Sequence, residues 1–153
     1  MKLASRNTLV RVSYVSEIPG RNQTSNDDNR IRMMADEPEA IIVGAGILGC
    51  ALAVALGKQG RRVVLIERDL SEPDRIVGEL LQPGGVRALR ELGLAECLDG
   101  IDAIPEYGYQ VIYKDEKVVI PYIGEDERTR QGRSFHHGRF IMRLRAAVQN
   151  VST

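Results

Sequence analysis

Three glycines at fixed spacing are the residues of this chain best suited to binding chemistry. Gly44, Gly46 and Gly49 form a GxGxxG motif directly after the apolar run 40–43. In such a motif the first glycine permits a tight turn, the second lets a pyrophosphate approach the backbone, and the third lets a helix pack closely on a strand. The N–H groups around Ile47 and Leu48 would then face the phosphates at the positive end of the helix dipole. The motif predicts a dinucleotide site, and a tight turn without a ligand is the alternative.

A single acidic residue completes this pattern. Glu67 ends the second apolar run, RVVLIE, where a carboxylate can accept hydrogen bonds from the ribose hydroxyls of an adenosine. A carboxylate at that place disfavours a 2′-phosphate, so NADP is not expected as the primary ligand. The glycines and Glu67 together fit either FAD or NAD. The alternative role for Glu67 is a solvated acid at the end of a strand.

The elements that must position these residues follow one another closely. A buried strand is predicted over Ala40–Val43, a helix over Gly46–Lys58 and a second buried strand over Arg62–Glu67, which together begin a βαβ unit. The fold class is therefore α/β, a Rossmann-like βαβ domain with an added β-hairpin. The later elements are a polar loop over Arg68–Gly85, a short helix over Val86–Leu92, a turn at Leu94–Leu98, a hairpin from Tyr107–Tyr113 and Lys117–Tyr122, a charged loop over Gly124–Gly132, and a helix from about Arg139.

Composition and charge argue against a nucleic-acid partner, a metal site and a membrane span. The 153 residues carry 21 Lys and Arg against 21 Asp and Glu, so there is no electrostatic reason to expect nucleic acid as a partner. Cys50 and Cys97 form no CxxC and have no nearby His, so we expect ordinary thiols and no metal site. The uncharged stretch Ala40–Leu56 contains glycines spaced for a strand, a turn and a helix, which argues against a membrane span. The polar segment 1–38 is expected to be a disordered tail, and 39–153 a partial FAD/NAD(P)-binding domain.

Two longer segments resemble one enzyme family. Residues 66–85 read IERDLSEPDRIVGELLQPGG, and residues 132–145 read GRSFHHGRFIMRLR. With the glycine motif, both segments resemble the squalene epoxidases. The resemblance implies an FAD-dependent, membrane-associated monooxygenase of sterol biosynthesis at the endoplasmic reticulum. It would convert squalene to 2,3-oxidosqualene with O₂, using electrons that a reductase partner delivers from NADPH.

The same resemblance implies roles for individual residues. Glu67 would hold the ribose with Arg68 flanking the adenosine end, and Gln82 and Tyr109 would face the substrate side near the flavin. Packing within a sheet is the alternative for Tyr109, and surface ion pairs are the alternative for the two arginines that follow. The pair His136–His137 belongs to a structural segment rather than to a metal or catalytic site. The remaining FAD contacts implied are Ile47 and Leu48 through their backbone, Arg75, Leu80 and Arg145.

The chain also departs from the family pattern. Four features of the family are not found in it: the later Gly-Asp segment of the flavin site, most of the substrate cavity, the C-terminal membrane-associated helices and the hydrophobic N-terminal anchor. We therefore expect a domain incomplete at its C-terminus, from a truncated gene model or splice product. Such a chain would not epoxidise squalene by itself and could be cytosolic. The alternatives are a non-catalytic FAD- or nucleotide-binding fragment, and a different flavoprotein hydroxylase or reductase with the same opening.

Overall fold

The computed structural model describes residues 10–14, 37–75 and 78–151. Contacts within the chain define two units. The first consists of residues 1–71 with 144–153, and the second of residues 72–143. One helix, α4 (His137–Val151), contributes residues to both units.

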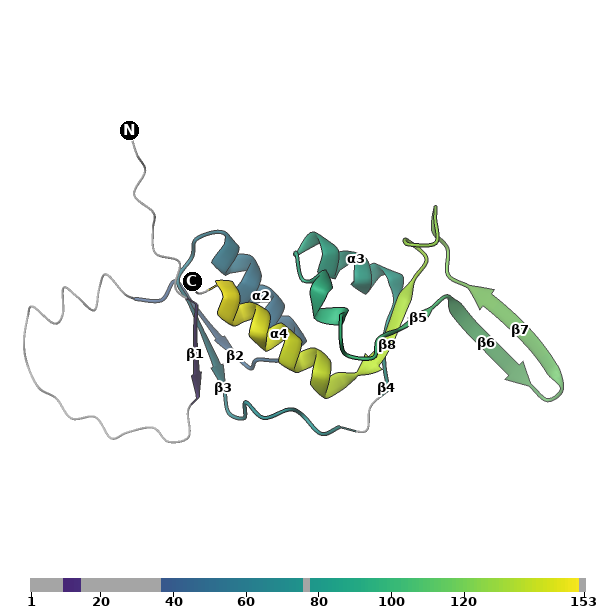
Figure 1. Ribbon diagram of the computed structural model, residues 1–153, viewed down its shortest axis with the longest axis horizontal. Coiled ribbons are helices and arrows are strands. Elements are labelled where there is room, and N and C mark those ends of the chain that lie inside the picture. Colours follow the sequence, from purple (N-terminus) through teal and green to yellow (C-terminus); the bar gives the residue numbers. More distant parts are fainter. Residues whose placement is uncertain (1–9, 15–36, 76–77, 152–153) are drawn as a thin grey trace, which may run out of the picture. The chain divides into compact units, whose positions relative to one another are not determined.

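The first unit is built on the predicted strand–helix–strand. Strand β2 (Ala40–Val43) leads through the glycine motif into helix α2 (Ile47–Lys58), and β3 (Val63–Glu67) then pairs with β2 in parallel, from Ala40↔Val63 to Val43↔Ile66 (Figure 1). The chain thus forms the expected Rossmann-like βαβ start, and its strands match the predicted apolar runs to within one residue. The prediction that β2 is buried is wrong, because its residues alternate between half-buried and exposed, with Ile41 62% and Val43 83% exposed on the uncovered face. The buried core residues of this unit are Ala45, Cys50, Ala53, Val54, Val63, Leu65, Leu144 and Val148.

A further strand lies within the segment expected to be a disordered tail. Strand β1 (Val10–Tyr14) pairs in parallel with β3, from Val10↔Val63 to Tyr14↔Glu67, so the sheet order is β1-β3-β2. The sequence signal was the alternation of Val10, Val12 and Tyr14 with polar residues, which has the period of a strand. Residues 1–9 and 15–36 lie outside the described residues, so the rest of that expectation stays a prediction.

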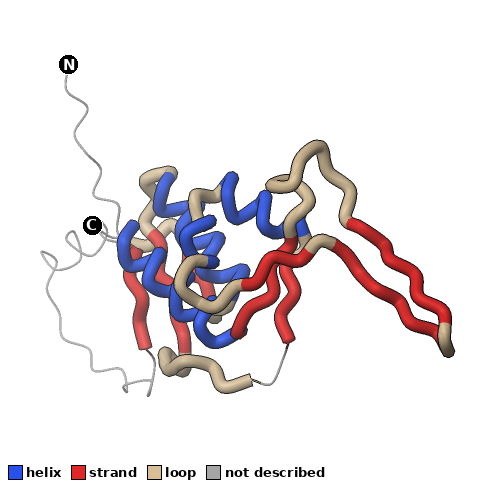
Figure 2. The backbone as a smooth tube through the Cα atoms, turned by 45° about the vertical axis from the view of Figure 1, so that its right-hand side comes forward, coloured by secondary structure: helices blue, strands red, loops and turns tan. Residues whose placement is uncertain are grey.

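The second unit combines a small antiparallel sheet with helices and a hairpin. Its three-stranded sheet has the order β4-β8-β5, formed by β4 (Gly78–Leu81), β8 (Gly132–His136) and β5 (Ile104–Glu106). Helix α3 (Pro83–Glu91) and the 3₁₀ turn η1 (Ala95–Leu98) lie between β4 and β5 in the chain. The predicted hairpin is present as β6 (Gly108–Tyr113) and β7 (Glu116–Pro121), and it extends away from that sheet (Figure 2). The buried core residues are Val86, Leu89, Leu94, Cys97, Leu98, Ile101, Phe135, Phe140 and Ile141.

Two segments differ from their predicted form. Strand β4 lies within the predicted loop Arg68–Gly85, and β8 begins at the end of the predicted loop Gly124–Gly132. The two strands pair with each other, with Gly78 opposite His136, although they are far apart in sequence. Neither segment has a strong local preference for a strand, so it is the pairing that stabilises both. Helix α3 also begins at Pro83, before the predicted start, because proline is favoured in the first turn of a helix.

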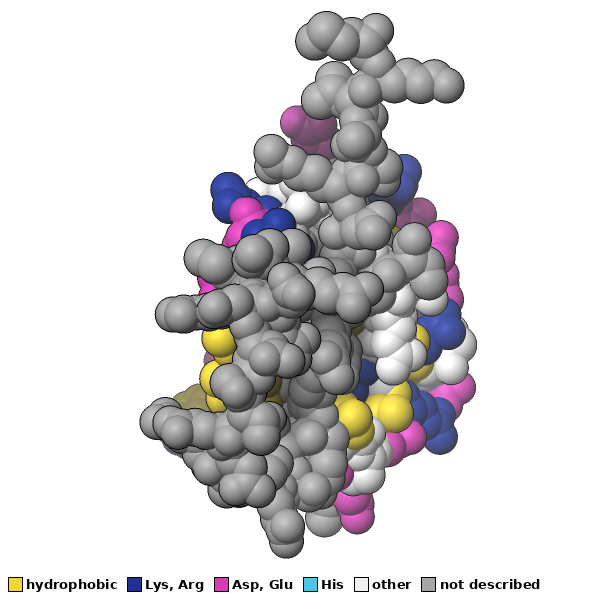
Figure 3. All heavy atoms as spheres, turned by 90° about the vertical axis from the view of Figure 1, so that its left-hand side faces the viewer, with side chains coloured by type: hydrophobic (Ala, Val, Ile, Leu, Met, Phe, Trp, Pro, Cys, Tyr) yellow, Lys and Arg dark blue, Asp and Glu magenta, His cyan; other side chains and the backbone are white. Residues whose placement is uncertain are grey.

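The equal numbers of basic and acidic residues are reflected in the mixed charges of the visible surface. Basic and acidic side chains are interspersed among the described residues visible on the face drawn in Figure 3. Among the described residues, no helix has both the length and the hydropathy needed to cross a membrane. The uncharged stretch 40–56 is divided between β2, the glycine motif and α2.

Gly49 gives a direct test of how α2 packs on β2. A Cβ atom at Gly49 would lie 1.9 Å from the Gly44 carbonyl oxygen, whereas a Cβ at Gly84 has no neighbour within 4 Å. We expect Gly49→Ala to lower the free energy of unfolding by about 3 kcal/mol, because helix and strand must separate to admit the methyl group. The matched change Gly84→Ala should leave the denaturation midpoint near that of the unsubstituted chain. Equal midpoints for the two variants would contradict this packing.

Candidate dinucleotide site

The glycine motif forms an open turn at the start of α2. Gly44 has φ +102°, a conformation that side chains rarely adopt, and its N–H still donates to the Ile66 carbonyl at 2.7 Å. Gly46 is the N-cap of α2, and no side chain caps the helix there. A Cβ added to Gly46 would meet nothing within 4 Å, so the space above this residue is open. Ile47 and Leu48 follow in the exposed first turn.

Glu67 connects this turn to the end of β3. Its Oε2 atom accepts a hydrogen bond from the Ala45 N–H at 2.7 Å. Its Oε1 atom accepts hydrogen bonds from the Arg68 N–H at 2.9 Å and the Asp69 N–H at 3.1 Å. A carboxylate can accept about four hydrogen bonds, so these three leave Glu67 some capacity for a ligand hydroxyl.

The environment of Glu67 favours its ionised form. Burial opposes ionisation, but hydrogen bonds from the backbone of Ala45, Asp69 and Arg68 and the charge of Arg145 outweigh it and hold the pKa of Glu67 below its ordinary value. The carboxylate is therefore charged at neutral pH and acts only as a hydrogen-bond acceptor.

Arg145 reaches the same turn from α4. Its Nε atom donates to the Ala45 carbonyl at 3.1 Å, and its Nη1 atom donates to the Ser71 carbonyl at 3.0 Å. Its Nη2 atom lies 3.7 Å from Oε2 of Glu67. Only 8% of the residue is exposed. Arg145 therefore links the glycine turn, the loop after β3 and α4, which is more than a surface ion pair would do.

These features fit one half of a dinucleotide. The uncapped, positive end of α2 and the open space at Gly46 suit a pyrophosphate, because its charge and its need for N–H donors match the helix start. Glu67 at the neighbouring strand end suits ribose hydroxyls. The first unit alone contains Gly44, Gly46, Ile47, Leu48, Gly49, Glu67, Arg68 and Arg145.

The remaining predicted residues belong to the second unit. Gln82 is the N-cap of α3, and its Nε2 atom donates to the Tyr109 hydroxyl of β6 at 2.8 Å. The structure thus brings together the two residues expected on the substrate side. Leu80 lies on β4 and is 40% exposed, so an apolar surface is available there.

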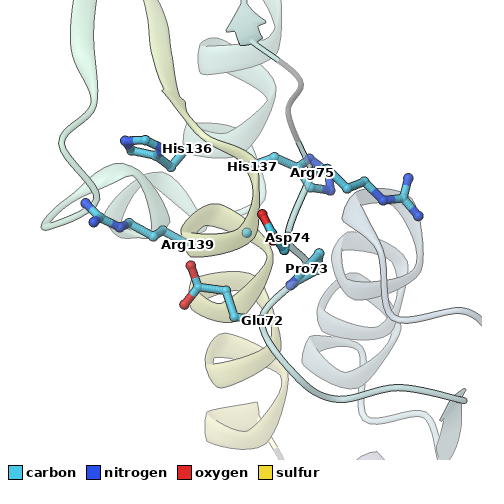
Figure 4. Close-up of a pocket in the computed structure, with 8 residues that line it drawn as sticks. Glu72, Pro73, Asp74, Arg75, His136, His137 and Arg139 are labelled. Atoms are coloured by element: carbon cyan, nitrogen blue, oxygen red, sulfur yellow. The ribbon is translucent and has the colours of Figure 1, made fainter.

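Arg75 lies at a polar cavity of about 340 Å³. In Figure 4 its guanidinium points away from His136 and Arg139, which lie on the other side of the cavity. Nδ1 of His137 lies 2.7 Å from Oε1 of Glu79, so this histidine joins the start of α4 to β4. The complete lining is Glu72, Pro73, Asp74, Arg75, His136, His137, Gly138 and Arg139.

Some residues take part in these sites without having been predicted. Ala45, Asp69 and Ser71 contribute backbone atoms to the network around Glu67. A backbone contact does not depend on side-chain type, so nothing in the sequence could have identified them. Tyr122 stacks edge to face on Tyr109, with ring centroids 5.3 Å apart. The signal for it was the pairing of the predicted hairpin strands, which brings the start of one strand near the end of the other.

Comparison with known proteins also indicates a dinucleotide site, in this case for FAD. The family described as FAD dependent oxidoreductase matches residues 39–145. The chain is similar to the squalene epoxidase of Aspergillus fumigatus, with 58% identity over 126 residues that cover 79% of this chain and 26% of that protein. It is also similar to the squalene epoxidase of Schizosaccharomyces pombe, with 53% identity over 120 residues that cover 78% of this chain and 26% of that protein. The chain thus spans about a quarter of the length of these relatives.

Solved structures share the fold. A variant of PqsL from Pseudomonas aeruginosa superposes with a TM-score of 0.62 and 26% sequence identity, covering 75% of this chain and 31% of that one.

The lowered pKa of Glu67 predicts a specific pH dependence. Because the folded-state pKa lies below the ordinary value of 4.5, the carboxylate contributes stability above about pH 4.5, and this contribution is lost as the pH falls through the folded pKa. We expect Glu67→Gln to be less stable than the unsubstituted chain at pH 7 and to lose less stability on acidification. The measurement is denaturant unfolding from pH 7 to pH 3.

The exposed Glu91, paired with Arg87 on α3, provides the control, since Glu91→Gln should keep the full acid dependence. Parallel pH profiles for Glu67→Gln and the unsubstituted chain would show that Glu67 has no such role.

Proposed function

This chain belongs to the family of FAD-dependent oxidoreductases, and from that premise we propose that it supplies the adenosine-binding half of the FAD site of a squalene epoxidase. The observation that carries the proposal is the 58% identity to the Aspergillus fumigatus squalene epoxidase, over 79% of this chain. The contacts around Glu67 support it, because they leave an uncapped helix start and a charged carboxylate beside an open turn.

Each residue of the first unit has a proposed task. Gly46 admits the pyrophosphate, and the N–H groups of Ile47 and Leu48 donate to it. Glu67 accepts hydrogen bonds from the ribose hydroxyls, with the capacity that its three backbone donors leave. Arg145 holds the turn and the following loop in place, and its charge favours a bound diphosphate. Gly44 and Gly49 permit the turn and the close packing of α2, and Arg68 flanks the adenosine.

The second unit would serve the flavin and substrate side. Bound FAD supplies the redox chemistry by which one oxygen atom of O₂ enters squalene to form 2,3-oxidosqualene. Arg75 is proposed to donate to phosphate or flavin oxygens, since its planar fork suits them. Leu80 offers apolar surface to the flavin and excludes water there. Gln82 and Tyr109 are proposed to face the substrate, with their side chains held in place by the hydrogen bond between them.

The partners and the location follow from this reaction. The substrate is an apolar triterpene, so the whole protein would take it up at a membrane surface, which we propose to be the endoplasmic reticulum. The electrons are proposed to come from NADPH through a separate reductase, as the resemblance to the squalene epoxidases implies.

A second candidate is a non-catalytic FAD- or nucleotide-binding fragment. The observation that favours it is that Ala45, Glu67, Ser71 and Arg145 all lie within the first unit, so the network around the turn is complete there.

Flavin retention tests the cofactor assignment. The 153-residue chain, mixed with FAD and then desalted, should keep visible flavin absorbance. A branched side chain would fill the space above the turn, so Gly46→Val should weaken FAD binding by at least about tenfold without changing the circular dichroism. The control Gly84→Val, at a glycine with equally open space on α3, should bind FAD like the unsubstituted chain. Undiminished FAD binding by Gly46→Val would refute the assignment.

A chimera tests the enzyme assignment. The segment of the Schizosaccharomyces pombe squalene epoxidase that matches this chain is replaced by this chain's residues, and epoxidation of squalene is measured with a reductase and NADPH. We expect activity in the chimera and its loss on Gly46→Val. A folded chimera that retains FAD but forms no 2,3-oxidosqualene would instead support the non-catalytic candidate.

A further inference from the structure

The loop that follows β3 contains a tight turn built on Asp69. Oδ1 of Asp69 accepts hydrogen bonds from the Ser71 hydroxyl at 2.6 Å and from the Ser71 N–H at 2.9 Å. A carboxylate that accepts from the backbone N–H two residues later closes an Asx turn, which has the shape of a backbone turn. The same two hydrogen bonds hold the pKa of Asp69 below its ordinary value, so the carboxylate is charged at neutral pH. The Asx turn therefore restricts the position of Ser71.

This turn completes a closed ring of hydrogen bonds around the glycine turn. Oε1 of Glu67 accepts from the Asp69 N–H at 3.1 Å, and the Asp69 side chain in turn binds Ser71. The Ser71 carbonyl accepts from Nη1 of Arg145 at 3.0 Å, and Nε of Arg145 donates to the Ala45 carbonyl at 3.1 Å. The Ala45 N–H then donates to Oε2 of Glu67 at 2.7 Å, which closes the ring. All five residues belong to the first unit.

The carboxylate of Asp69 is the part of this ring that keeps the exposed loop in place. Glu67 and Arg145 are largely covered, whereas Asp69 and Ser71 are exposed. Without the Asp69 carboxylate, Ser71 would lose two hydrogen bonds and its carbonyl could move away from Arg145. The long Arg145 side chain would then be held less firmly, because fixing its rotamers costs conformational entropy.

We propose that Asp69 is a positioning residue of the cofactor site, which acts through Ser71 to hold Arg145 and the glycine turn in the geometry that binds the diphosphate of FAD. This inference rests on the proposed function for the identity of the cofactor. A charge acting alone would have the opposite effect, because a carboxylate repels an anionic cofactor and its removal would strengthen binding. A positioning group instead weakens binding when it is removed, although the site then becomes more positive.

Hydrogen exchange at Arg145 tests the positioning without any cofactor. The Arg145 Nε–H is bonded to the Ala45 carbonyl and the residue is buried, so in the 153-residue chain its NMR signal should exchange slowly with water at mildly acidic pH. Asp69→Ala should speed this exchange by at least about threefold. Asp69→Asn should not, because an asparagine side chain also closes an Asx turn. The control Asp99→Ala, at an exposed aspartate of the second unit, should leave the exchange rate unchanged.

FAD titration of the same chain tests the consequence for the cofactor. Asp69→Ala should raise the Kd for FAD by about three- to tenfold. Asp69→Asn removes the charge and keeps the turn, so it should bind FAD at least as tightly as the unsubstituted chain. Asp69→Glu keeps the charge on a longer side chain that does not fit the turn, so it should weaken binding as Asp69→Ala does. Asp99→Ala should bind FAD like the unsubstituted chain.

The outcomes that would overturn the proposal are distinct from a failure of the proposed function. An unchanged Arg145 exchange rate in folded Asp69→Ala would overturn it, and so would FAD binding that is unchanged or tighter. If circular dichroism shows that Asp69→Ala does not fold, the other pair decides, since weaker binding in Asp69→Asn but not in Asp69→Glu would show that only the charge matters. An unsubstituted chain that retains no FAD would count against the proposed function, and the exchange at Arg145 would still decide whether Asp69 positions it.

Discussion

The geometry of the candidate site depends on one carboxylate that holds three backbone N–H groups. The two oxygens of Glu67 bind the glycine turn through Ala45 and the loop after β3 through Arg68 and Asp69. A half-buried carboxylate without donors would be costly, and here the donors and the nearby charge of Arg145 compensate for its burial. The same contacts hold the turn in which the space above Gly46 is open.

The sequence predicted the parts of the fold in which local pattern and long-range contacts agree. The runs 40–43 and 62–67 are short and apolar, and the helix up to Lys58 is rich in Ala and Leu and follows the glycine motif directly, so β2, α2 and β3 appear where they were predicted. Strands β4 and β8 were missed because neither has a strong local preference and each is stabilised by the other. Strand β1 was missed for a different reason: a short alternating pattern within a polar segment was outweighed by its surroundings.

Within the first unit, some residues of the candidate site were predictable from the sequence and others were not. The glycines and Glu67 could be identified from spacing alone, because the physical requirement is a turn without side chains followed by an acid at a strand end. Arg145 comes 100 positions after Ala45, whose carbonyl it binds, and only the family resemblance drew attention to it. Its contacts with two backbone carbonyls could not be derived, since carbonyl oxygens are the same in every residue.

The phosphate-binding turn can be identified from the sequence more fully than the role of the Tyr109 hydroxyl can, and this difference has a chemical basis. A phosphate-binding turn works through backbone N–H groups, so its sequence signature is the absence of side chains, and glycine records that absence directly. A hydroxyl near a substrate works through the direction of one proton, which depends on the partners that occupy its lone pairs. For Tyr109 one such partner is Gln82, which lies at the start of α3. A tyrosine can therefore be recognised in the sequence as a candidate, while its role as donor or acceptor is decided only when the folded chain brings its neighbours together.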